Sequence, residues 1–311
     1  MAFIPIRTKT IRGNKPLFFN LYLNIREREV LYIKKNDPIE EERLQRLKNK
    51  KIKKVFIEAD AEENYLKYLE ANLNRIEDKS IPLAERSSII EGQAMCAVED
   101  VFENPEKRET YEYSKNVVTK YVSFISENDK ALGNLVNLQT GDFDSYQHSL
   151  NVSSLSIGLA LQKGINKKKE LDSLGMGALL HDIGKTKLNI DPKKEIGTYS
   201  EAEMIELKKH PEAGAELMSK GGFVDKDVLT YILQHEEHVN GSGYPKQLRG
   251  SQIAPFTQFI SLANTYDRYI TFFKMTPKEA MKKITIEKVG LYNLDQIENL
   301  KKLLIEQGVY K

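Results

Sequence analysis

The chain has 311 residues, and its 47 basic and 45 acidic residues leave a formal net charge of +2 at pH 7. This balance produces no global field that would mark DNA or a membrane surface as a partner. No stretch approaches the roughly 18 consecutive apolar residues of a membrane-spanning helix, and residues 1–5 lack the apolar block of a signal peptide, so we expect a cytoplasmic protein. The single cysteine, Cys96, excludes an intramolecular disulfide and a multi-thiolate zinc site, so any metal must be held by nitrogen and oxygen ligands.

The N-terminal part predicts a small mixed domain. Apolar and polar residues alternate over about residues 1–35, and 54–57 is another short apolar run, as expected for strands. The segments 40–48 and 65–73 carry apolar residues at helical spacing. Residues 1–82 are therefore predicted to form a small α/β accessory or regulatory domain.

Residues 83–138 are predicted to be a pair of linking helices. The segment 83–127 contains no glycine except Gly92, and its apolar stripes are interrupted near Asn104 and Pro105. Because the stripes lack sustained heptads, a connecting helical pair explains them better than a coiled-coil interface, although a homodimer stays open.

Residues 139–311 predict an all-α domain, which makes the fold class α+β. All five histidines of the protein fall between His148 and His238. His181 and Asp182 stand side by side after the apolar run 171–180, which predicts a buried helix that Gly184 ends. Adjacent nitrogen and oxygen ligands at an interior position are typical of metal chemistry.

Further histidines lie at the edges of apolar helical stripes. Asp144 and His148 are one turn apart and share a helix face. His210 is expected to end a helix that begins at Ser200, and His235 follows an apolar face formed by residues 228–232. Four helices can thus converge on one point.

Imidazole and carboxylate ligands without thiolate suit divalent iron, manganese or zinc. A bridging Asp182 could hold two such ions about 4 Å apart, where a shared hydroxide is a strong nucleophile and both ions stabilise charge on a phosphoryl group. The loop that follows, with Gly243, Tyr244 and Pro245, is suited to close approach of a ligand. Taken alone, such a loop is more often a simple turn between helices.

Together these motifs resemble the HD-GYP family, a branch of the HD superfamily of metal-dependent phosphohydrolases. The resemblance covers about residues 139–270 and consists of the segments 147–152, 181–185, 210–214 and 243–245. It implies an all-helical catalytic domain with two divalent transition metals, or three, most often iron or manganese. It also implies hydrolysis of the bacterial messenger cyclic di-GMP to pGpG or GMP.

The resemblance assigns roles residue by residue. The ligands of the two metals share one carboxylate: His148, His181 and Asp182 for one ion, and Asp182, His210 and His235 for the other. Asp144 matches an acidic position that serves a third metal in some members. Lys185 matches a lysine placed against the scissile phosphate, which with Asp182 makes up the predicted catalytic pair, and Gly243 and Tyr244 match the substrate loop.

The chain also departs from the family pattern. Glu236 stands where a second histidine is usual, and Asn264 stands where an aspartate completes the shell of the first metal. Both remain in the predicted ligand set, because the charge gained at 236 partly offsets the charge lost at 264. Gln258 replaces a usual arginine, and residues 269–274 replace an arginine-proline-tyrosine segment on the substrate side.

Two interpretations follow from these matches and departures. The intact ligand positions and Lys185 favour an active cyclic di-GMP phosphodiesterase of bacterial second-messenger signalling. The substrate-side departures favour a degenerate relative that binds a nucleotide or a signalling protein without turnover. We expect the first, with a cyclic dinucleotide as the partner; a different phosphoester substrate is a third, lesser alternative.

Overall fold

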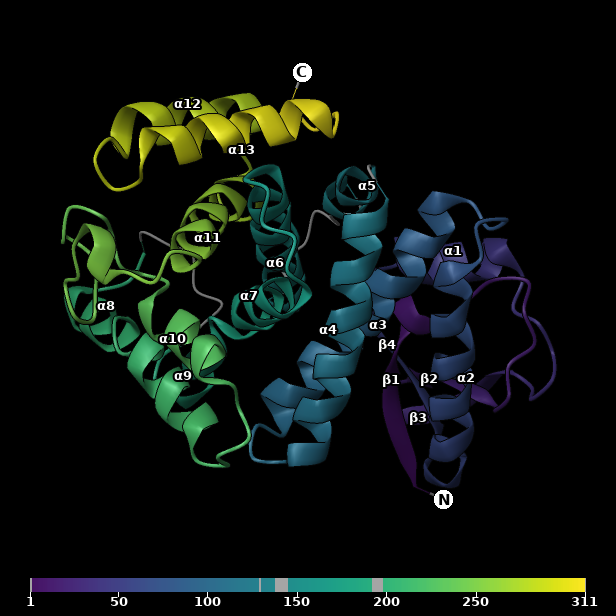
Figure 1. Cartoon of the computed structure of the whole chain (residues 1–311). Helices are drawn as coiled ribbons and strands as arrows, with labels where there is room; N and C mark the ends of the chain where they lie inside the picture. Colours follow the sequence, from purple (N-terminus) through teal and green to yellow (C-terminus); the bar gives the residue numbers. More distant parts are fainter. Residues whose placement is uncertain (1, 129, 138–144, 192–197, 311) are drawn as a thin grey trace. The chain divides into compact units, whose positions relative to one another are not determined.

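A computed structural model of the chain describes residues 2–128, 130–137, 145–191 and 198–310 (Figure 1). The chain forms two compact units, Met1–Cys96 and Ala97–Lys311. The division between them falls within helix α3 (Leu83–Glu103). The three domains predicted from the sequence, 1–82, 83–138 and 139–311, stay a prediction.

The first unit is built on a four-stranded antiparallel sheet with strand order β1-β4-β2-β3. Its elements are β1 (Phe3–Arg7), β2 (Leu21–Ile25), β3 (Arg28–Ile33), α1 (Glu41–Asn49), β4 (Lys54–Glu58) and α2 (Glu62–Asn74). Alternate strand residues such as Ile6, Val55 and Ile57 are buried in one core cluster with Leu44 of α1 and Leu69 of α2. The predicted strands and helices of this part are confirmed.

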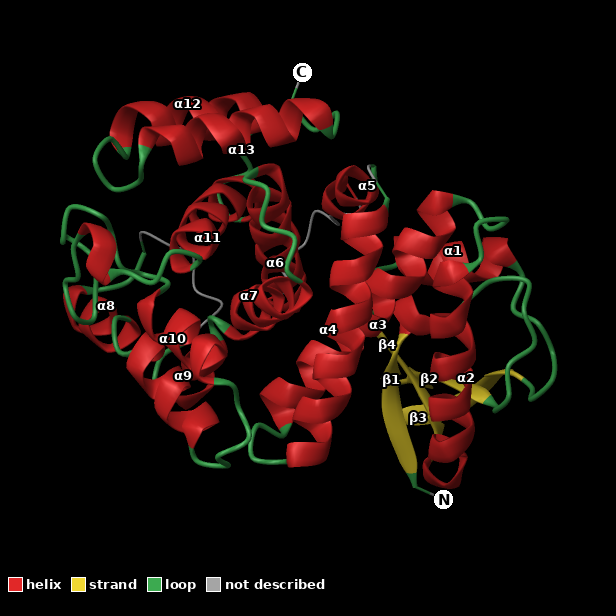
Figure 2. Cartoon of the chain, in the orientation of Figure 1, coloured by secondary structure: helices red, strands yellow, loops and turns green. Residues whose placement is uncertain are grey.

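Among its described residues, the second unit has helices and connecting loops but no strand (Figure 2). Its further helices are α4 (Arg108–Glu127), α5 (Ala131–Asn137), α6 (Ser145–Gln162), α7 (Lys168–Leu180), α8 (Glu201–Leu207), α9 (His210–Ser219), α10 (Lys226–Gln234), α11 (Thr257–Thr271), α12 (Pro277–Glu287) and α13 (Leu294–Glu306). The predicted break near Asn104 and Pro105 separates α3 from α4. Within the described ranges, no helix is both long and apolar enough to cross a bilayer.

Helix α6 lies at the centre of this unit, packed against α7 and α11 (Figure 1). Three of its buried serines donate their hydroxyls to main-chain carbonyls, Ser153 to Gly175, Ser154 to Leu150 and Ser156 to Val152, whereas the buried hydroxyl of Ser149 has no partner among the described residues. These small side chains let neighbouring helices approach closely. The central position of α6 carries His148 into the interior.

Two local expectations are wrong. Helix α7 ends at Leu180, and Gly184 lies in the following 3-10 turn, Ile183–Lys187. Gly184 is needed for space instead, because a Cβ atom there would lie 2.0 Å from the carbonyl oxygen of His210. His210 does not end the helix that Ser200 caps; it begins the next one, α9, since Pro211 suits the first helical turn.

Candidate metal centre

Four buried histidines converge in the second unit. His148 lies on α6, His181 directly follows α7, His210 begins α9 and His235 directly follows α10. Each is at most 2% exposed. The fifth histidine, His238, lies in the loop after α10 and packs against the ring of Tyr292 instead.

Each of the four imidazoles is oriented through its Nδ1 atom. Nδ1 of His181, His210 and His235 donates to the main-chain carbonyl three residues earlier, at 2.7, 2.7 and 2.8 Å. Nδ1 of His148 is 2.6 Å from a carboxylate oxygen of Asp267. Because these acceptors require the proton on Nδ1, the neutral form of each imidazole presents its lone pair on Nε2, as a metal-binding imidazole must.

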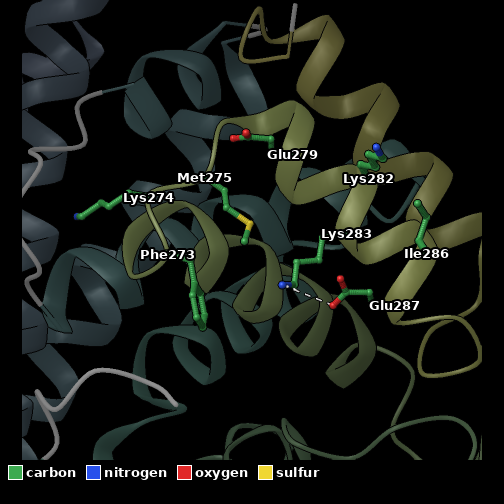
Figure 3. Close-up of a pocket in the computed structure, with 8 residues that line it drawn as sticks. All are labelled: Phe273, Lys274, Met275, Glu279, Lys282, Lys283, Ile286 and Glu287. Carbon is green, nitrogen blue, oxygen red and sulfur yellow. Dashed lines mark ion pairs between the residues drawn. The ribbon is translucent and has the colours of Figure 1, made fainter. Parts of the chain in front are cut away.

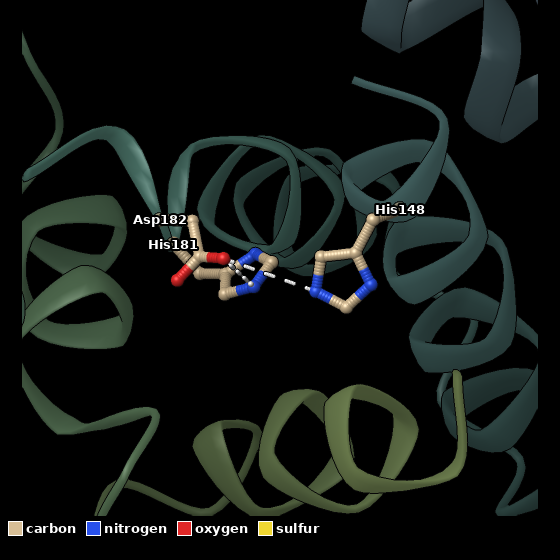
Figure 4. Close-up of side chains that lie close together, drawn as sticks. All are labelled: His148, His181 and Asp182. Carbon is tan, nitrogen blue, oxygen red and sulfur yellow. Dashed lines mark ion pairs between the residues drawn. The ribbon is translucent and has the colours of Figure 1, made fainter. Parts of the chain in front are cut away.

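Asp182 stands between two pairs of these histidines, and Figure 4 shows it with one pair, His148 and His181. Its Oδ2 lies 3.5 Å from Nε2 of His181 and 3.9 Å from Nε2 of His148. Its Oδ1 lies 3.3 Å from Nε2 of His210 and 3.8 Å from Nε2 of His235. The structure thus brings together two triads of potential ligands that share one carboxylate, and they consist of the residues that the family resemblance implied.

The polar atoms of this cluster fit a cation. Nε2 of His210 and Nε2 of His235 are 2.9 Å apart, although both present lone pairs. Nε2 of His181 and Oδ1 of Asp182 are buried, and neither has a hydrogen-bond partner among the residues described. Unsatisfied buried acceptors of this kind are costly, and a divalent cation would satisfy them together.

The electrostatics keep these groups in the protonation states that metal binding needs. Burial would raise the pKa of Asp182, but the Lys185 ammonium, 2.6 Å away, and the surrounding histidines hold it well below its usual value. Burial, together with Lys185, lowers the pKa of His210 to about 3. Burial likewise lowers the pKa of His181 and His235. The carboxylate of Asp182 is therefore charged, and the imidazoles of His181, His210 and His235 are neutral, at neutral pH.

Glu236 and Asn264, the two departures within the predicted ligand set, are in contact with each other. Nδ2 of Asn264 is 3.5 Å from Oε1 of Glu236, which also accepts from Nη1 of Arg268 at 3.2 Å. The same Glu236 oxygen lies 4.0 Å from Nε2 of His235, outside both triads. Burial would raise the pKa of Glu236, but Arg268 and His235 lower it to about 2. Metal ligation by Glu236 and Asn264 stays a prediction.

The predicted substrate loop reaches the cluster. The ring of Tyr244 lies 6.2 Å from that of His210, and its N–H donates to the carbonyl of Glu236 at 3.1 Å. A Cβ on Gly243 would lie 2.5 Å from that carbonyl oxygen, so only glycine allows this fold of the loop. Of the other predictions, Asp144 falls outside the described residues, and the amide of Gln258 pairs with Asn293.

Sequence reasoning missed two contributors on α11. Asp267 accepts from His148 and also from Nδ2 of Asn151, at 2.8 Å. Arg268 pairs with Glu236. Both could have been noticed from their spacing, because positions three and four residues after Asn264 share its helix face.

A separate cavity of about 440 Å³ lies between the end of α11 and α12 (Figure 3). It shares no residue with the cluster, and its lining is Phe273, Lys274, Met275, Glu279, Lys282, Lys283, Ile286 and Glu287. Lys283 and Glu287, one turn apart on α12, form an ion pair within this lining.

Comparison with known proteins agrees with this geometry. The HD domain family matches residues 130–292. The cyclic di-GMP phosphodiesterase PA4108 of Pseudomonas aeruginosa is 27% identical over 183 residues, which are 58% of this chain and 44% of that protein. The cyclic di-GMP phosphodiesterase PdeB of Borreliella burgdorferi is 32% identical over 125 residues, which are 40% of this chain and 32% of that protein. The chain thus spans less than half the length of these curated relatives.

One solved structure resembles almost the whole chain. Bd1817, an HDG"Y"P protein from Bdellovibrio bacteriovorus, superposes with a TM-score of 0.87 at 38% identity and covers 98% of this chain and 100% of its own. The HD domain implies dependence on divalent metal, and the two triads around Asp182 are compatible with it. The converging histidines, the shared carboxylate and these similarities show that the chain belongs to the HD domain family and, within it, to the HD-GYP-type proteins.

Proposed function

We propose that the protein is a metal-dependent phosphodiesterase that hydrolyses cyclic di-GMP to pGpG or GMP in bacterial second-messenger signalling. The observation that carries the proposal is Asp182, whose two oxygens face two separate pairs of histidine Nε2 atoms. This is the arrangement needed to hold two ions on opposite sides of one carboxylate. The relatives named as cyclic di-GMP phosphodiesterases support the choice of substrate.

The proposed metals are two divalent ions, iron or manganese, because the donors are imidazole and carboxylate. When bound, such ions would polarise a phosphoryl oxygen and lower the pKa of a water molecule. His148, His181 and Asp182 would hold one ion, and Asp182, His210 and His235 the other. A third ion at Asp144 belongs to the same proposal.

The chain's own residues supply the rest of the chemistry. Lys185 lies against Asp182, with its side chain 25% exposed, and its ammonium can shift to a phosphate oxygen and stabilise charge that develops there. The four Nδ1 hydrogen bonds prevent the imidazoles from turning, so their geometry exists before substrate arrives. Gly243 and Tyr244 would form the wall of the substrate pocket nearest His210.

The test combines elemental analysis of the purified protein with a turnover assay in which cyclic di-GMP, pGpG and GMP are separated. Asp182→Asn keeps the shape of the side chain but removes the shared charge, so it is expected to lose most of the metal and all measurable turnover. Asp295→Asn, at an exposed ion pair with Lys163, is the matched control and is expected to retain both.

Two results would contradict the proposal. Full metal content in Asp182→Asn would show that the carboxylate of Asp182 is not shared between two metal ions. Wild-type protein that binds metal and cyclic di-GMP without turnover would favour the non-catalytic receptor. A cytoplasmic location, a homodimer and signalling protein partners are parts of the proposal tested separately, by cell fractionation, by the mass of the purified protein in solution and by co-purification.

A further inference from the structure

Arg268 is an additional cation beside the metal centre. It lies on α11, one helical turn after Asn264, and its side chain is 26% exposed. Its Nη1 atom donates to Oε1 of Glu236 at 3.2 Å. Within the part of the chain that the structure describes, this is the only hydrogen bond of the guanidinium group. Its remaining N–H groups are therefore available to a ligand.

Glu236 forms a hydrogen-bonded ion pair with this arginine. Its Oε1 atom accepts from Arg268 and Asn264, and its charge acts on the Tyr244 hydroxyl, whose pKa burial and Glu236 raise well above its usual value. To bind a metal ion, Glu236 would have to break a charge-assisted hydrogen bond and leave the arginine unpaired in a mostly buried position. The pair is thus better suited to hold the arginine in place than to complete a metal shell.

Arg268 and Lys185 both act on the shared carboxylate. Lys185 Nζ lies 2.6 Å from Oδ2 of Asp182. Burial would lower the pKa of Arg268, but Glu236, Tyr244 and Asp182 together raise it, so its charge is permanent. A phosphodiester that approached the centre would therefore meet two protein cations in addition to any metal.

We propose that Arg268 binds a non-bridging phosphate oxygen of the substrate and that Glu236 is its positioning residue instead of a metal ligand. This inference rests on the phosphodiesterase function proposed above and assigns a phosphate-binding group within that site. A guanidinium suits the role because its planar set of donors can hold Glu236 on one edge and a phosphate on another.

The experiment measures metal content by elemental analysis and the affinity of the metal-loaded full-length protein for inorganic phosphate by calorimetry. Kinetics with cyclic di-GMP give kcat and KM in parallel. Arg268→Ala is expected to weaken phosphate binding and raise KM by about 10- to 100-fold, the effect of one charge-assisted hydrogen bond. Arg268→Lys should recover part of the affinity, and metal content should not change.

Two further variants separate the roles of the pair. Glu236→Gln is expected to keep its metal and to weaken phosphate binding less than Arg268→Ala does. The double variant Arg268→Ala/Glu236→Gln removes both charges at once, so it leaves no unpaired carboxylate that could misfold the site or move onto the metal. It should match Arg268→Ala in phosphate affinity. Arg108→Ala, an exposed arginine paired with Glu112, is the control and should match the wild type.

Several outcomes would overturn the inference. Loss of metal in Glu236→Gln would show that Glu236 is a metal ligand. Unchanged phosphate affinity in the double variant would show that Arg268 has only a structural role. Because phosphate binding is measured without turnover, the result for Arg268 stands even if cyclic di-GMP proves not to be the substrate.

Discussion

At the scale of single residues, the site depends on glycines that leave space for close backbone contacts and on side chains whose charge differs from the family pattern. Gly184 and Gly214 allow the turn after Asp182 to lie directly against the start of α9. Asn264, a predicted metal ligand, places a neutral amide 3.5 Å from Oε1 of Glu236. Oδ1 of Asn264 is buried, without a hydrogen-bond partner among the described residues.

Gly184→Ala should separate the two triads. The added Cβ would lie 2.0 Å from the oxygen of His210 and 2.5 Å from the nitrogen of Gly214, and main-chain atoms cannot move aside cheaply. We expect a loss of about 1–3 kcal/mol in the free energy of unfolding, as for other overpacked sites, together with lower metal content. Urea denaturation measures the free energy of unfolding, and elemental analysis measures the metal content.

The matched control for that change is Gly175→Ala. Its Cβ would meet side-chain methyl groups, those of Val118 and Val122 at 3.2 Å and that of Ile157 at 3.5 Å, so the variant should lose less stability and keep its metal content. Equal effects of the two substitutions would mean that Gly184 has no special relation to the site.

Asn264→Asp is expected to raise metal retention at the position held by His148 and His181, because a carboxylate adds charge and a stronger oxygen ligand. The new charge would face Glu236, whose Oε1 is 3.5 Å from the present amide nitrogen. The double change Asn264→Asp/Glu236→His should therefore increase metal content more than the single change. Elemental analysis after dialysis against a chelator measures the retained metal. If neither variant retains more metal than the wild type, Asn264 does not belong to the metal shell.

At the scale of elements, α11 orients the ligand that α6 delivers. Asp267 accepts from His148 and is itself held by Asn151 at 2.8 Å and by Thr271 at 3.0 Å. Partners of this kind fix the tautomer and ring orientation of a metal-binding imidazole and raise its basicity. The packing of α11 against α6 thus fixes the orientation of the His148 imidazole.

Asp267→Asn should weaken metal binding by about 10- to 100-fold while the chain stays folded, since the amide keeps the shape of the carboxylate but not its charge. Titration with a competing chelator measures the affinity, and circular dichroism checks the fold. Asp172→Asn, which changes a carboxylate on α7 that accepts from Thr119, is the control. An unchanged affinity in Asp267→Asn would show that His148 needs no such support.

At the scale of the whole molecule, the metal triads draw all their residues from the second unit. Residues 83–96, which begin helix α3, belong to the first unit, and the rest of α3 belongs to the second. Within the second unit, the hydroxyl of Ser114 in α4 donates to the carbonyl of Ala97 in α3. We therefore expect the α3–α4 pair to be needed for the stability of the second unit.

A fragment of residues 83–311 should fold and keep its metal. A fragment of residues 108–311, which lacks α3, should lose stability because the buried hydroxyl of Ser114 in α4 would lose its acceptor, the carbonyl of Ala97 in α3. Thermal unfolding and metal analysis of both fragments test this. If the longer fragment is unfolded or free of metal, the N-terminal sheet is part of the same folding unit.

The sequence by itself determined the elements and the chemical type of the site, because both depend on local order. Helical spacing, the capping box at Ser200 and Glu203 and the pair His181–Asp182 are all properties of neighbouring residues. Only the tertiary structure decided which oxygen of Asp182 faces which histidines, that Asp267 orients His148 across 119 residues, and that Arg268 neutralises Glu236 across 32. These contacts depend on how α6, α10 and α11 pack and on which way their side chains point, and no local pattern encodes that.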